Sequence, residues 1–274
     1  TATNFAAGGI CGFMVNGCGT IKDCENYGDV KAMTYASGIC GGSQPGKSIT
    51  TYNYLIEDCL NSGKLSTTNG VGSAGIAGSY SGAIKNCNNN GNVDDTQGTA
   101  KSKQYTAGIV SCASFAVDIE GCYNRGAISG VKNVGGIVGN VMKGDEAATV
   151  IKNCRNDGSV SGQDMYVAGI AANSARNEGV VSVVSCTNNG EVTSTGTTEF
   201  IGNLRGNTTI ALGEGNIIGA GLKALPLDPD TQTGIDNTNV NTGKTANGVF
   251  LRNGQIVIVK NNKKYTINGI EIAE

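Results

Sequence analysis

Hydrophobic and polar positions along the chain follow one repeated pattern. An aliphatic residue is followed three positions later by Cys, and then Asn, Gly and a second aliphatic residue follow at intervals of two. The six copies are marked by Cys24, Cys59, Cys87, Cys122, Cys154 and Cys186, and their Asn residues are Asn26, Asn61, Asn89, Asn124, Asn156 and Asn188. The Cys residues are 35, 28, 35, 32 and 32 positions apart. A nearly fixed period of this length predicts a repeat protein.

Each copy contains three short apolar segments separated by turn signals. In the fifth copy they are Gly135-Gly136-Ile137, the segment that contains Ile151 and the segment that contains Val160. β-branched residues dominate the apolar positions and no sustained helical period is present, so we expect strands. The Asn-x-Gly between the second and third segments predicts a turn in which Gly supplies a positive φ. The sequence therefore predicts an all-β fold, a parallel β-helix (β-solenoid) of about six coils plus a cap.

Equivalent residues of successive coils are expected to stack in columns. The Asn amides of one column can hydrogen-bond from coil to coil, and the Cys column can be buried as small hydrophobic side chains. An Asn row that binds a sugar is the alternative, but turn chemistry already accounts for each Asn. The ten cysteines could also form a disulfide framework. Six of them at one repeat position favour reduced thiols, and Cys11 with Cys18 is the pair that could still bridge a short loop.

The pattern predicts three parts along the chain. Residues 1–222 form the β-solenoid, in which residues 197–222 are the terminal cap because no Cys follows there. Residues 223–245 form a polar linker that contains two Pro. Residues 246–274 form a small antiparallel β-hairpin tail, because Asn-Gly pairs separate runs of alternating apolar residues. The first repeat starts so close to Thr1 that we expect the natural N-terminus, with any export signal, to have been removed.

Composition and charge exclude several classes. The 43 Gly follow no period of three and only three Pro are present, which excludes collagen. Hydrophobic residues make up 39% of the chain at regular positions, which argues against disorder. A net charge of −2 gives no electrostatic reason to expect nucleic acid as a partner. No run of eighteen apolar residues is present, so no membrane-spanning segment is predicted.

The repeat resembles the GLUG motif of bacterial surface and adhesin-like proteins. The resemblance lies in Gly-Gly-Ile-Val-Gly at 135–139 and Ile-x-Asn-Cys-x-Asn-x-Gly-x-Val at 151–160, and it extends over about residues 7–192. Residues 247–272 are similar to C-terminal segments of secreted proteins from gut Bacteroidetes, some of which are sorting signals. The resemblance implies a cell-surface or extracellular protein that functions in adhesion, and it implies no catalytic residues.

Catalytic and cofactor chemistry find little support in the sequence. Residues 41–48 fit the spacing of a phosphate-binding loop, but β-branched and aromatic residues follow Lys47 where a helix is required, so no nucleotide is predicted. The chain has no His, which excludes Ser-His and Cys-His nucleophiles. Without His, a CxxC pair or an Asp-rich calcium loop, we predict no metal and no cofactor. The acids available to a carbohydrate-active enzyme occupy different repeat positions and are explained better as loop charges: Asp94, Asp95, Asp118, Glu120, Asp145 and Glu146, with Lys101 or Lys103 nearby.

A binding site is expected where the repeat does not specify the residues. The insertion at 43–55 carries the candidate ligand-binding residues Tyr52, Tyr54, Lys47 and Asn53, and the connection at 94–103 adds charged side chains. Three further tyrosines precede the Ile of the Gly-Ile segment by four residues and are expected to cover a corner of the coil: Tyr35, Tyr105 and Tyr166. The sequence thus favours a non-enzymatic surface module that binds a host or environmental glycan or protein. Alternatives are a carbohydrate-active β-helix enzyme and a passive stalk or scaffold that displays another domain.

Overall fold

The structure is a computed structural model of the whole chain. It describes residues 6–15, 18–43, 53–69, 71–97, 104–141, 149–164, 166–174, 180–194, 198–204, 209–212, 216, 248–252, 255–260, 263–266 and 271–272. Every described secondary-structure element is a β-strand. The chain divides into two compact units, Thr1–Pro226 and Leu227–Glu274. The predicted linker at 223–245 lies outside the described residues.

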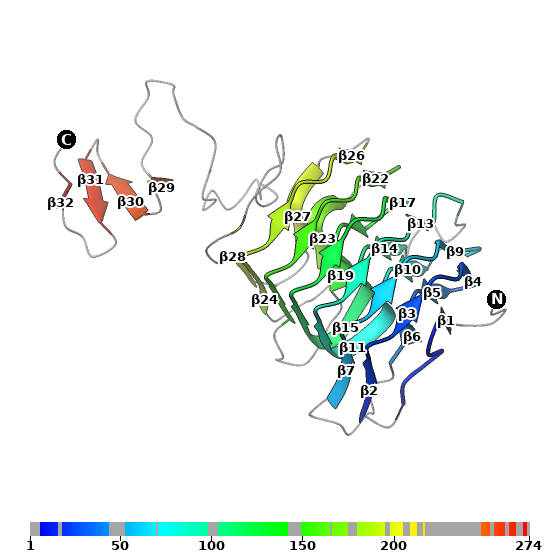
Figure 1. Cartoon of the computed structure of the whole chain (residues 1–274). Helices are drawn as coiled ribbons and strands as arrows, with labels where there is room; N and C mark the ends of the chain where they lie inside the picture. The colour runs from blue at the N-terminus through cyan, green and yellow to red at the C-terminus, as the bar shows by residue number, and fades with distance from the viewer. Residues whose placement is uncertain are drawn as a thin grey trace. The chain divides into compact units, whose positions relative to one another are not determined.

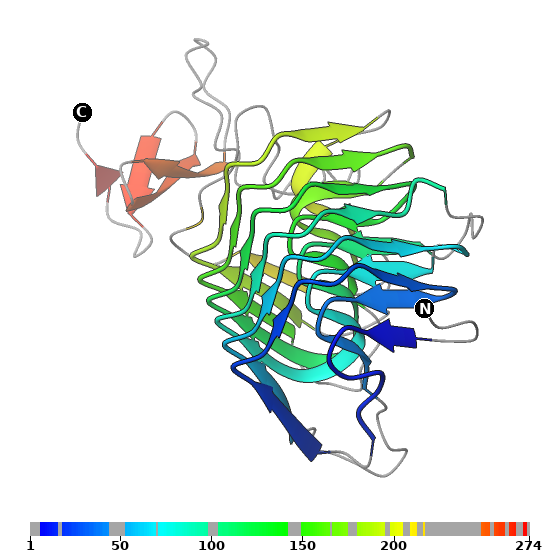
Figure 2. The same ribbon diagram turned by 45° about the vertical axis from the view of Figure 1, so that its right-hand side comes forward.

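The first unit is a stack of coils joined into three parallel sheets (Figures 1 and 2). One six-stranded sheet, called the Asn sheet below, takes two residues from each coil. Its strands are β3 (Glu25–Asn26), β8 (Leu60–Asn61), β12 (Asn88–Asn89), β16 (Tyr123–Asn124), β21 (Arg155–Asn156) and β25 (Thr187–Asn188). Its register pairs Asn61 with Asn89 and Asn89 with Asn124, so the repeat motif itself stacks in register.

A second six-stranded sheet carries the aliphatic residue that closes each repeat. Its strands are β4 (Val30–Ala32), β9 (Leu65–Thr67), β13 (Val93–Asp94), β17 (Ile128–Gly130), β22 (Val160–Gly162) and β26 (Val192–Ser194). All neighbouring strands in it are parallel. Because each coil adds one strand to each of these sheets, the predicted parallel β-solenoid is confirmed.

The third sheet has sixteen strands and forms the remaining sides of the coils. Its strands are β1 (Ala6–Gly8), β2 (Cys18–Lys22), β5 (Tyr35–Ser37), β6 (Cys40–Gly42), β7 (Asn53–Glu57), β10 (Gly72–Ala74), β11 (Ala77–Lys85), β14 (Tyr105–Ala107), β15 (Val110–Glu120), β18 (Val134–Gly135), β19 (Val138–Val141), β20 (Thr149–Lys152), β23 (Val167–Ser174), β24 (Val180–Val184), β27 (Thr198–Leu204) and β28 (Thr209–Leu212). The Gly-Ile segments were expected to be strands, but Gly38-Ile39 forms the bend between β5 and β6. The Ile still points inward, and Ile39, Ile76 and Ile109 are fully buried.

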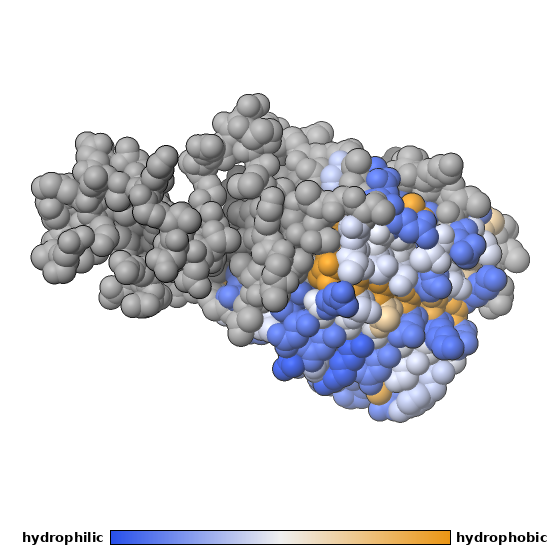
Figure 3. Space-filling view, turned by 90° about the horizontal axis from the view of Figure 1, so that it is seen from above, coloured by the Kyte–Doolittle hydropathy of each residue, from blue (hydrophilic) through white to orange (hydrophobic). Residues whose placement is uncertain are grey.

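The interior of the coils holds two apolar clusters. The larger contains the Cys column and the Ile residues of the Gly-Ile segments from the second coil onward, and the smaller contains the closing aliphatic residues such as Leu65, Val93 and Ile128. Burial of one such side chain stabilises the fold by about 1.5–3 kcal/mol. Hydrophilic residues cover much of the described surface seen from above, where hydrophobic residues show as a narrow band (Figure 3). The repeated aliphatic positions therefore supply the core.

The turns differ from the prediction in one respect. No Gly of the Asn-x-Gly motif is among the described residues with positive φ. A Cβ on Gly63 would lie 2.0 Å from the carbonyl oxygen of Gly28, so Gly is required there because successive coils approach backbone to backbone. The left-handed corner lies instead directly before the Cys, at Asp23, Asp58, Asn86, Gly121, Asn153 and Ser185, where φ is between 51 and 63°.

The stack continues beyond the last complete coil. Strand β27 pairs with β23 and β28 pairs with β24, both parallel. Asn216 bonds to the last complete coil, because its Oδ1 accepts from the Cys186 N–H at 2.8 Å and its Nδ2 donates to the Val183 carbonyl at 3.0 Å. The terminal cap at 197–222 stays a prediction, because many of its residues lie outside the described ones.

The second unit contains a four-stranded antiparallel sheet of β29 (Gly248–Arg252), β30 (Gln255–Lys260), β31 (Lys263–Thr266) and β32 (Glu271–Ile272). Arg252 pairs with Gln255 across the predicted Asn-Gly turn. The hairpin tail expected from the alternating pattern is therefore present. In the part of the chain that the structure describes, no helix is long and apolar enough to cross a membrane.

Candidate ligand-binding surface

The stacked Asn side chains fix the geometry of the Asn sheet. Asn89 Nδ2 donates to Asn124 Oδ1 at 2.8 Å, and Asn124 Nδ2 donates to Asn156 Oδ1 at 2.7 Å. The second proton of each amide goes to the carbonyl of the Gly two residues later, as from Asn124 to Gly126 at 3.0 Å. The same bonds join Asn26 to Asn61, Asn61 to Asn89, and Asn156 to Asn188. These buried amides are fully engaged, so the ladder is structural and offers nothing to a ligand.

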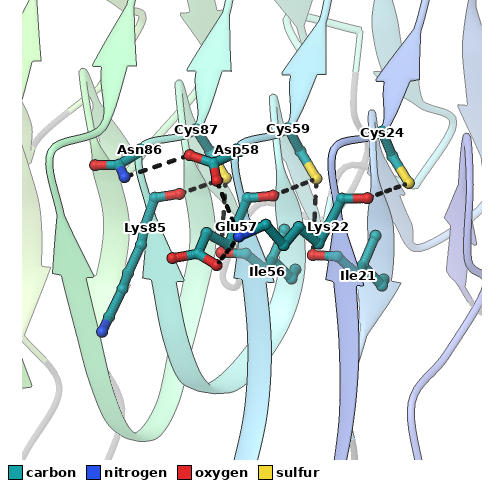
Figure 4. A network of polar contacts seen from close by, with 10 residues as sticks. All are labelled: Ile21, Lys22, Cys24, Ile56, Glu57, Asp58, Cys59, Lys85, Asn86 and Cys87. Atoms are coloured by element: carbon teal, nitrogen blue, oxygen red, sulfur yellow. Dashed lines mark hydrogen bonds and ion pairs between the residues drawn. The ribbon is translucent and has the colours of Figure 1, made fainter.

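The Cys column lies inside the same corner. Cys59, Cys87, Cys122, Cys154 and Cys186 are at most 1% exposed, and Cys24 in the first coil is half-buried. Each thiol donates to the carbonyl two residues before it, for example Cys87 to Lys85 at 3.1 Å (Figure 4). Cys87 Sγ also lies 3.7 Å from the Ile56 carbonyl of the preceding coil. All ten cysteines are free thiols, including Cys11 and Cys18.

An alternating row of charges flanks this column on the outside. The register places Lys22 beside Glu57, Glu57 beside Lys85, and Glu120 beside Lys152. Lys22 Nζ lies 2.8 Å from Glu57 Oε2 and 3.4 Å from Asp58 Oδ2, as Figure 4 shows. These exposed pairs neutralise one another, and screening by solvent leaves each with little effect on stability. They form a solvated ladder rather than a site.

The predicted ligand-binding insertion is corrected at one residue. Tyr54 lies in β7, where its side chain is 1% exposed and belongs to the larger core cluster, so its assignment to a ligand-binding loop is wrong. Strand alternation explains this, because Tyr54 points inward with Ile56 while Asn53 is exposed. Lys47 and Tyr52 lie outside the described residues. Of the three repeat tyrosines, Tyr35 is half-buried, and burial raises its pKa well above the usual range.

The candidate catalytic acids do not come together in the described part of the chain. Asp95 is 1% exposed, and its Oδ1 accepts from the Thr67 N–H, the Thr67 hydroxyl and the Ser73 hydroxyl at 2.8–2.9 Å. Asp94 beside it is exposed and binds Thr96. Glu120 pairs with Lys152 at 3.1 Å on another sheet. Asp118 is exposed on β15, and Asp145, Glu146, Lys101 and Lys103 lie outside the described residues.

A different group of side chains gathers on the outer face of the Asn sheet. Along each strand the ladder Asn points inward, so the residues on either side of it point outward. In neighbouring coils these outward residues are Tyr123 and Arg125, then Arg155 and Asp157. The Arg125 guanidinium carbon lies 3.5 Å from the centre of the Tyr123 ring, and that of Arg155 lies 5.1 Å from it. One aromatic ring thus positions two cations.

Asp157 ties this group together. It accepts from the Tyr123 hydroxyl, from Arg155 Nε at 2.7 Å and from Asn189 Nδ2 at 2.9 Å. Partial burial is the largest single influence and raises the pKa of the Asp157 carboxyl, but the hydrogen bonds from Arg155, Tyr123 and Asn189, with the positive charge of Arg155, together outweigh it and hold the pKa below its usual range. The hydrogen bond to Asp157 in turn raises the pKa of Arg155. Asp157 and Arg155 are therefore both charged at neutral pH and hold each other in place.

Sequence reasoning did not single out these residues. They occupy the two x positions of Cys-x-Asn-x-Gly, where the residue type changes from one repeat to the next. The usable signal is alternation: once Asn is assigned inward, both flanking positions must face solvent. The described residues contain no group of three or more His, Cys, Asp or Glu side chains that could hold a metal ion.

Comparison with known proteins gives little further information. No family model matches the chain and no curated protein is similar to it, so the resemblance to the GLUG motif stays a prediction. One solved structure, from Bacteroides ovatus and named "putative immunoglobulin A1 protease", is 24% identical over 76% of this chain, with a TM-score of 0.42. The chain spans 66% of that protein's length. The name describes the Bacteroides protein and assigns no activity to this chain.

Proposed function

We propose that this chain is a non-enzymatic adhesion module of a bacterial cell-surface or secreted protein, and that it binds a host or environmental glycan or protein. The observation that carries the proposal is that each coil uses some positions for the fold and leaves others free to contact a ligand. Residues set by the repeat are used in the core, the Asn ladder and the corners, while the flanking positions of the Asn sheet face outward and differ from coil to coil. A rigid body with a variable outer face is suited to recognition.

The energetic argument supports binding without catalysis. The outward group is pre-organised, since Tyr123, Arg155 and Asp157 hold one another before any ligand arrives. Pre-organised side chains lose less conformational entropy on binding. Catalysis would need a proton donor and a base placed on opposite sides of a substrate bond, and the candidate acids Asp94 on β13 and Glu120 on β15 lie on different sheets. Weak binding by one such face is strengthened when a cell presents many copies.

Bead retention under flow tests the proposal. The full chain, coupled at high density to beads, is passed over surfaces coated with host glycans and matrix proteins, and retention is counted with and without free chain as competitor. We expect retention on at least one surface that is abolished by the free chain and by prior heat unfolding. Beads that are retained nowhere, or equally by folded and unfolded chain, would favour a passive stalk.

A further inference from the structure

We propose that the face centred on Tyr123 binds acidic polysaccharides through the guanidinium groups of Arg125 and Arg155. This rests on the adhesion function proposed above and names the class of ligand for it. The face comprises Tyr123, Arg125, Arg155 and Asp157 together with three amide side chains, Asn88, Asn90 and Asn189.

Arg125 is placed to bind an anion. Its side chain is exposed, and its guanidinium face stacks on the Tyr123 ring at 3.5 Å. Stacking uses the π face of the cation and leaves its in-plane N–H donors directed away from the ring. Its hydrogen bonds to the protein are long, 3.4 Å to Asn88 Oδ1 and 3.4 Å to Asn90 Oδ1. Among the residues that the structure describes, no carboxylate lies within ion-pair distance of Arg125.

Arg155 adds a second cation one coil away. Its Nε is held by Asp157, and among the described residues its two terminal nitrogens have no hydrogen-bond or ion-pair partner. The side chain is 51% exposed. Two arginines and one aspartate leave the group with a net charge of one positive unit. The two guanidinium groups come from strands about 4.8 Å apart, so both can contact a polymer that carries acidic groups along its length.

The neighbouring residues favour a sugar polymer over a peptide. Asn88, Asn90 and Asn189 present amide groups that both donate and accept hydrogen bonds, as sugar hydroxyls require. The exposed large hydrophobic residues of the described chain, Ile10, Phe13, Val15 and Tyr27, all lie in the first coil, away from this face in the fourth and fifth coils. Protein hot spots also favour Tyr and Arg, but here the Tyr123 ring is stacked beneath the Arg125 guanidinium and no exposed large aliphatic side chain lies beside it, so the face has no free apolar anchor for a protein.

Arginine also suits a carboxylate as the acidic group. A guanidinium matches a planar carboxylate with two parallel hydrogen bonds, and such charge-assisted pairs are among the stronger polar contacts. Uronic acids supply a carboxylate on each acidic sugar, so a uronate polymer is the predicted ligand. A sulfate ester offers the same charge on a tetrahedral group whose oxygens a guanidinium can also bind in pairs, so a sulfated polymer is the comparison that separates the two sources.

The test uses the full chain and matched polymers. Affinity for polygalacturonate is measured by biolayer interferometry against the same polymer after its carboxyl groups are reduced to alcohols, with dextran sulfate against dextran and poly-glutamate as further arms. We expect binding to polygalacturonate that weakens as salt is raised, with at least tenfold weaker binding to the reduced polymer and to poly-glutamate, and no preference for dextran sulfate.

Single substitutions locate the site. Arg125→Gln and Arg155→Gln should each weaken polygalacturonate binding roughly tenfold, the loss expected for one charged hydrogen bond. Lys31→Gln removes an exposed charge from β4 and should leave binding unchanged. Tyr123→Phe keeps the ring and removes the bond to Asp157, so it should weaken binding less than either arginine variant. Melting temperatures confirm that each variant is folded.

The outcomes separate this inference from the adhesion function. Equal binding to the reduced polymer, or unchanged binding by both arginine variants, overturns the inference while leaving adhesion standing. Preference for dextran sulfate or poly-glutamate also overturns the uronate assignment. A chain that binds none of these polymers and no surface in the bead assay contradicts the proposed function itself.

Discussion

Gly108 lies directly against the side chain of Asn124 across the interior of its coil. A Cβ on Gly108 would be 2.4 Å from Asn124 Cγ and 2.2 Å from the Gly136 carbonyl oxygen. The same contact recurs between Gly75 and Asn89. The Gly of the Gly-Ile segment and the Asn of the turn motif, 16 residues apart in this coil, are therefore two halves of one contact. Their joint recurrence in the sequence follows from it.

Gly108→Ala is expected to destabilise the fold. The methyl group must displace either a backbone carbonyl or an Asn engaged on both sides, and overpacking of this kind costs about 1–3 kcal/mol. Chemical denaturation measures the loss. Gly12→Ala is the matched control, because nothing lies within 4 Å of a Cβ at Gly12. Equal stability of the two variants would show that the Gly108 contact is not restrictive.

Asn124→Ala tests the ladder itself. The substitution removes the bonds to Gly126 and Asn156 and leaves Asn89 Nδ2 with one acceptor fewer. A buried donor left without its partner costs about 1–3 kcal/mol. The melting temperature should fall, whereas Asn53→Ala, at an exposed position of β7, should leave it unchanged. A melting temperature of Asn124→Ala equal to that of the parent would contradict a bonded ladder.

The buried carboxyl of Asp95 predicts a pH effect on stability. Burial raises its pKa, and the hydrogen bonds from Ser73, Thr67 and Thr106 offset only part of this. Because the folded pKa lies above the unfolded value of about 3.9, protonation favours the folded state. The contribution to stability is complete below about pH 4 and is lost as the pH rises through the folded pKa.

Thermal melts of Asp95→Asn against the parent between about pH 3 and pH 7 measure this effect. We expect the difference in melting temperature to move in favour of Asp95→Asn as the pH rises. Asp94→Asn, exposed and one residue away, controls for the loss of one carboxylate. An identical pH dependence for the two variants would remove Asp95 as the cause.

Thiol labelling tests the burial of the cysteines. Burial raises the pKa of Cys112 to about 11, and the bonds to Asn140 and Ser114 lower it only partly. A buried, protonated thiol reacts slowly because the thiolate is the nucleophile. At about pH 8, Cys18, which is exposed, should be labelled first, and Cys112 with the five fully buried column cysteines only after unfolding. Peptide mass spectrometry that finds Cys87 labelled in the folded chain, or joined to Cys122, would contradict the structure.

Much of the fold could be predicted from the sequence because each coil has the same residue types at its equivalent positions. The Asn, Cys and Ile columns were predictable, since a stacked residue must suit its own copy above and below. The corner before the Cys was not predictable, because Asp58, Asn86 and Ser185 all have a left-handed backbone there but are different residue types. The Gly of Asn-x-Gly was predicted to supply a positive φ, whereas in the structure it is required by a close approach of two backbones. Both conditions select Gly, so the sequence alone does not distinguish them.

The binding surface was harder to predict than the fold. Tyr54 looked like a loop residue because it follows a long insertion, although its two-residue spacing from Ile56 already indicated the inward face. Tyr123 and Arg125 carry no repeat signal at all, because a position exposed in every coil is free to vary. What joins them to Arg155 is register between coils, which a single sequence does not display.

The most direct test of the central claim, adhesion without turnover, is to recover the ligand after binding. The full chain is held at equilibrium with polygalacturonate, or with any other polymer or protein that retains the beads, and the ligand is then released by salt and its mass distribution measured. The account predicts saturable, reversible binding and a recovered ligand of unchanged mass. Shortened ligand that accumulates with time, in proportion to the amount of folded chain, would show that this solenoid is an enzyme.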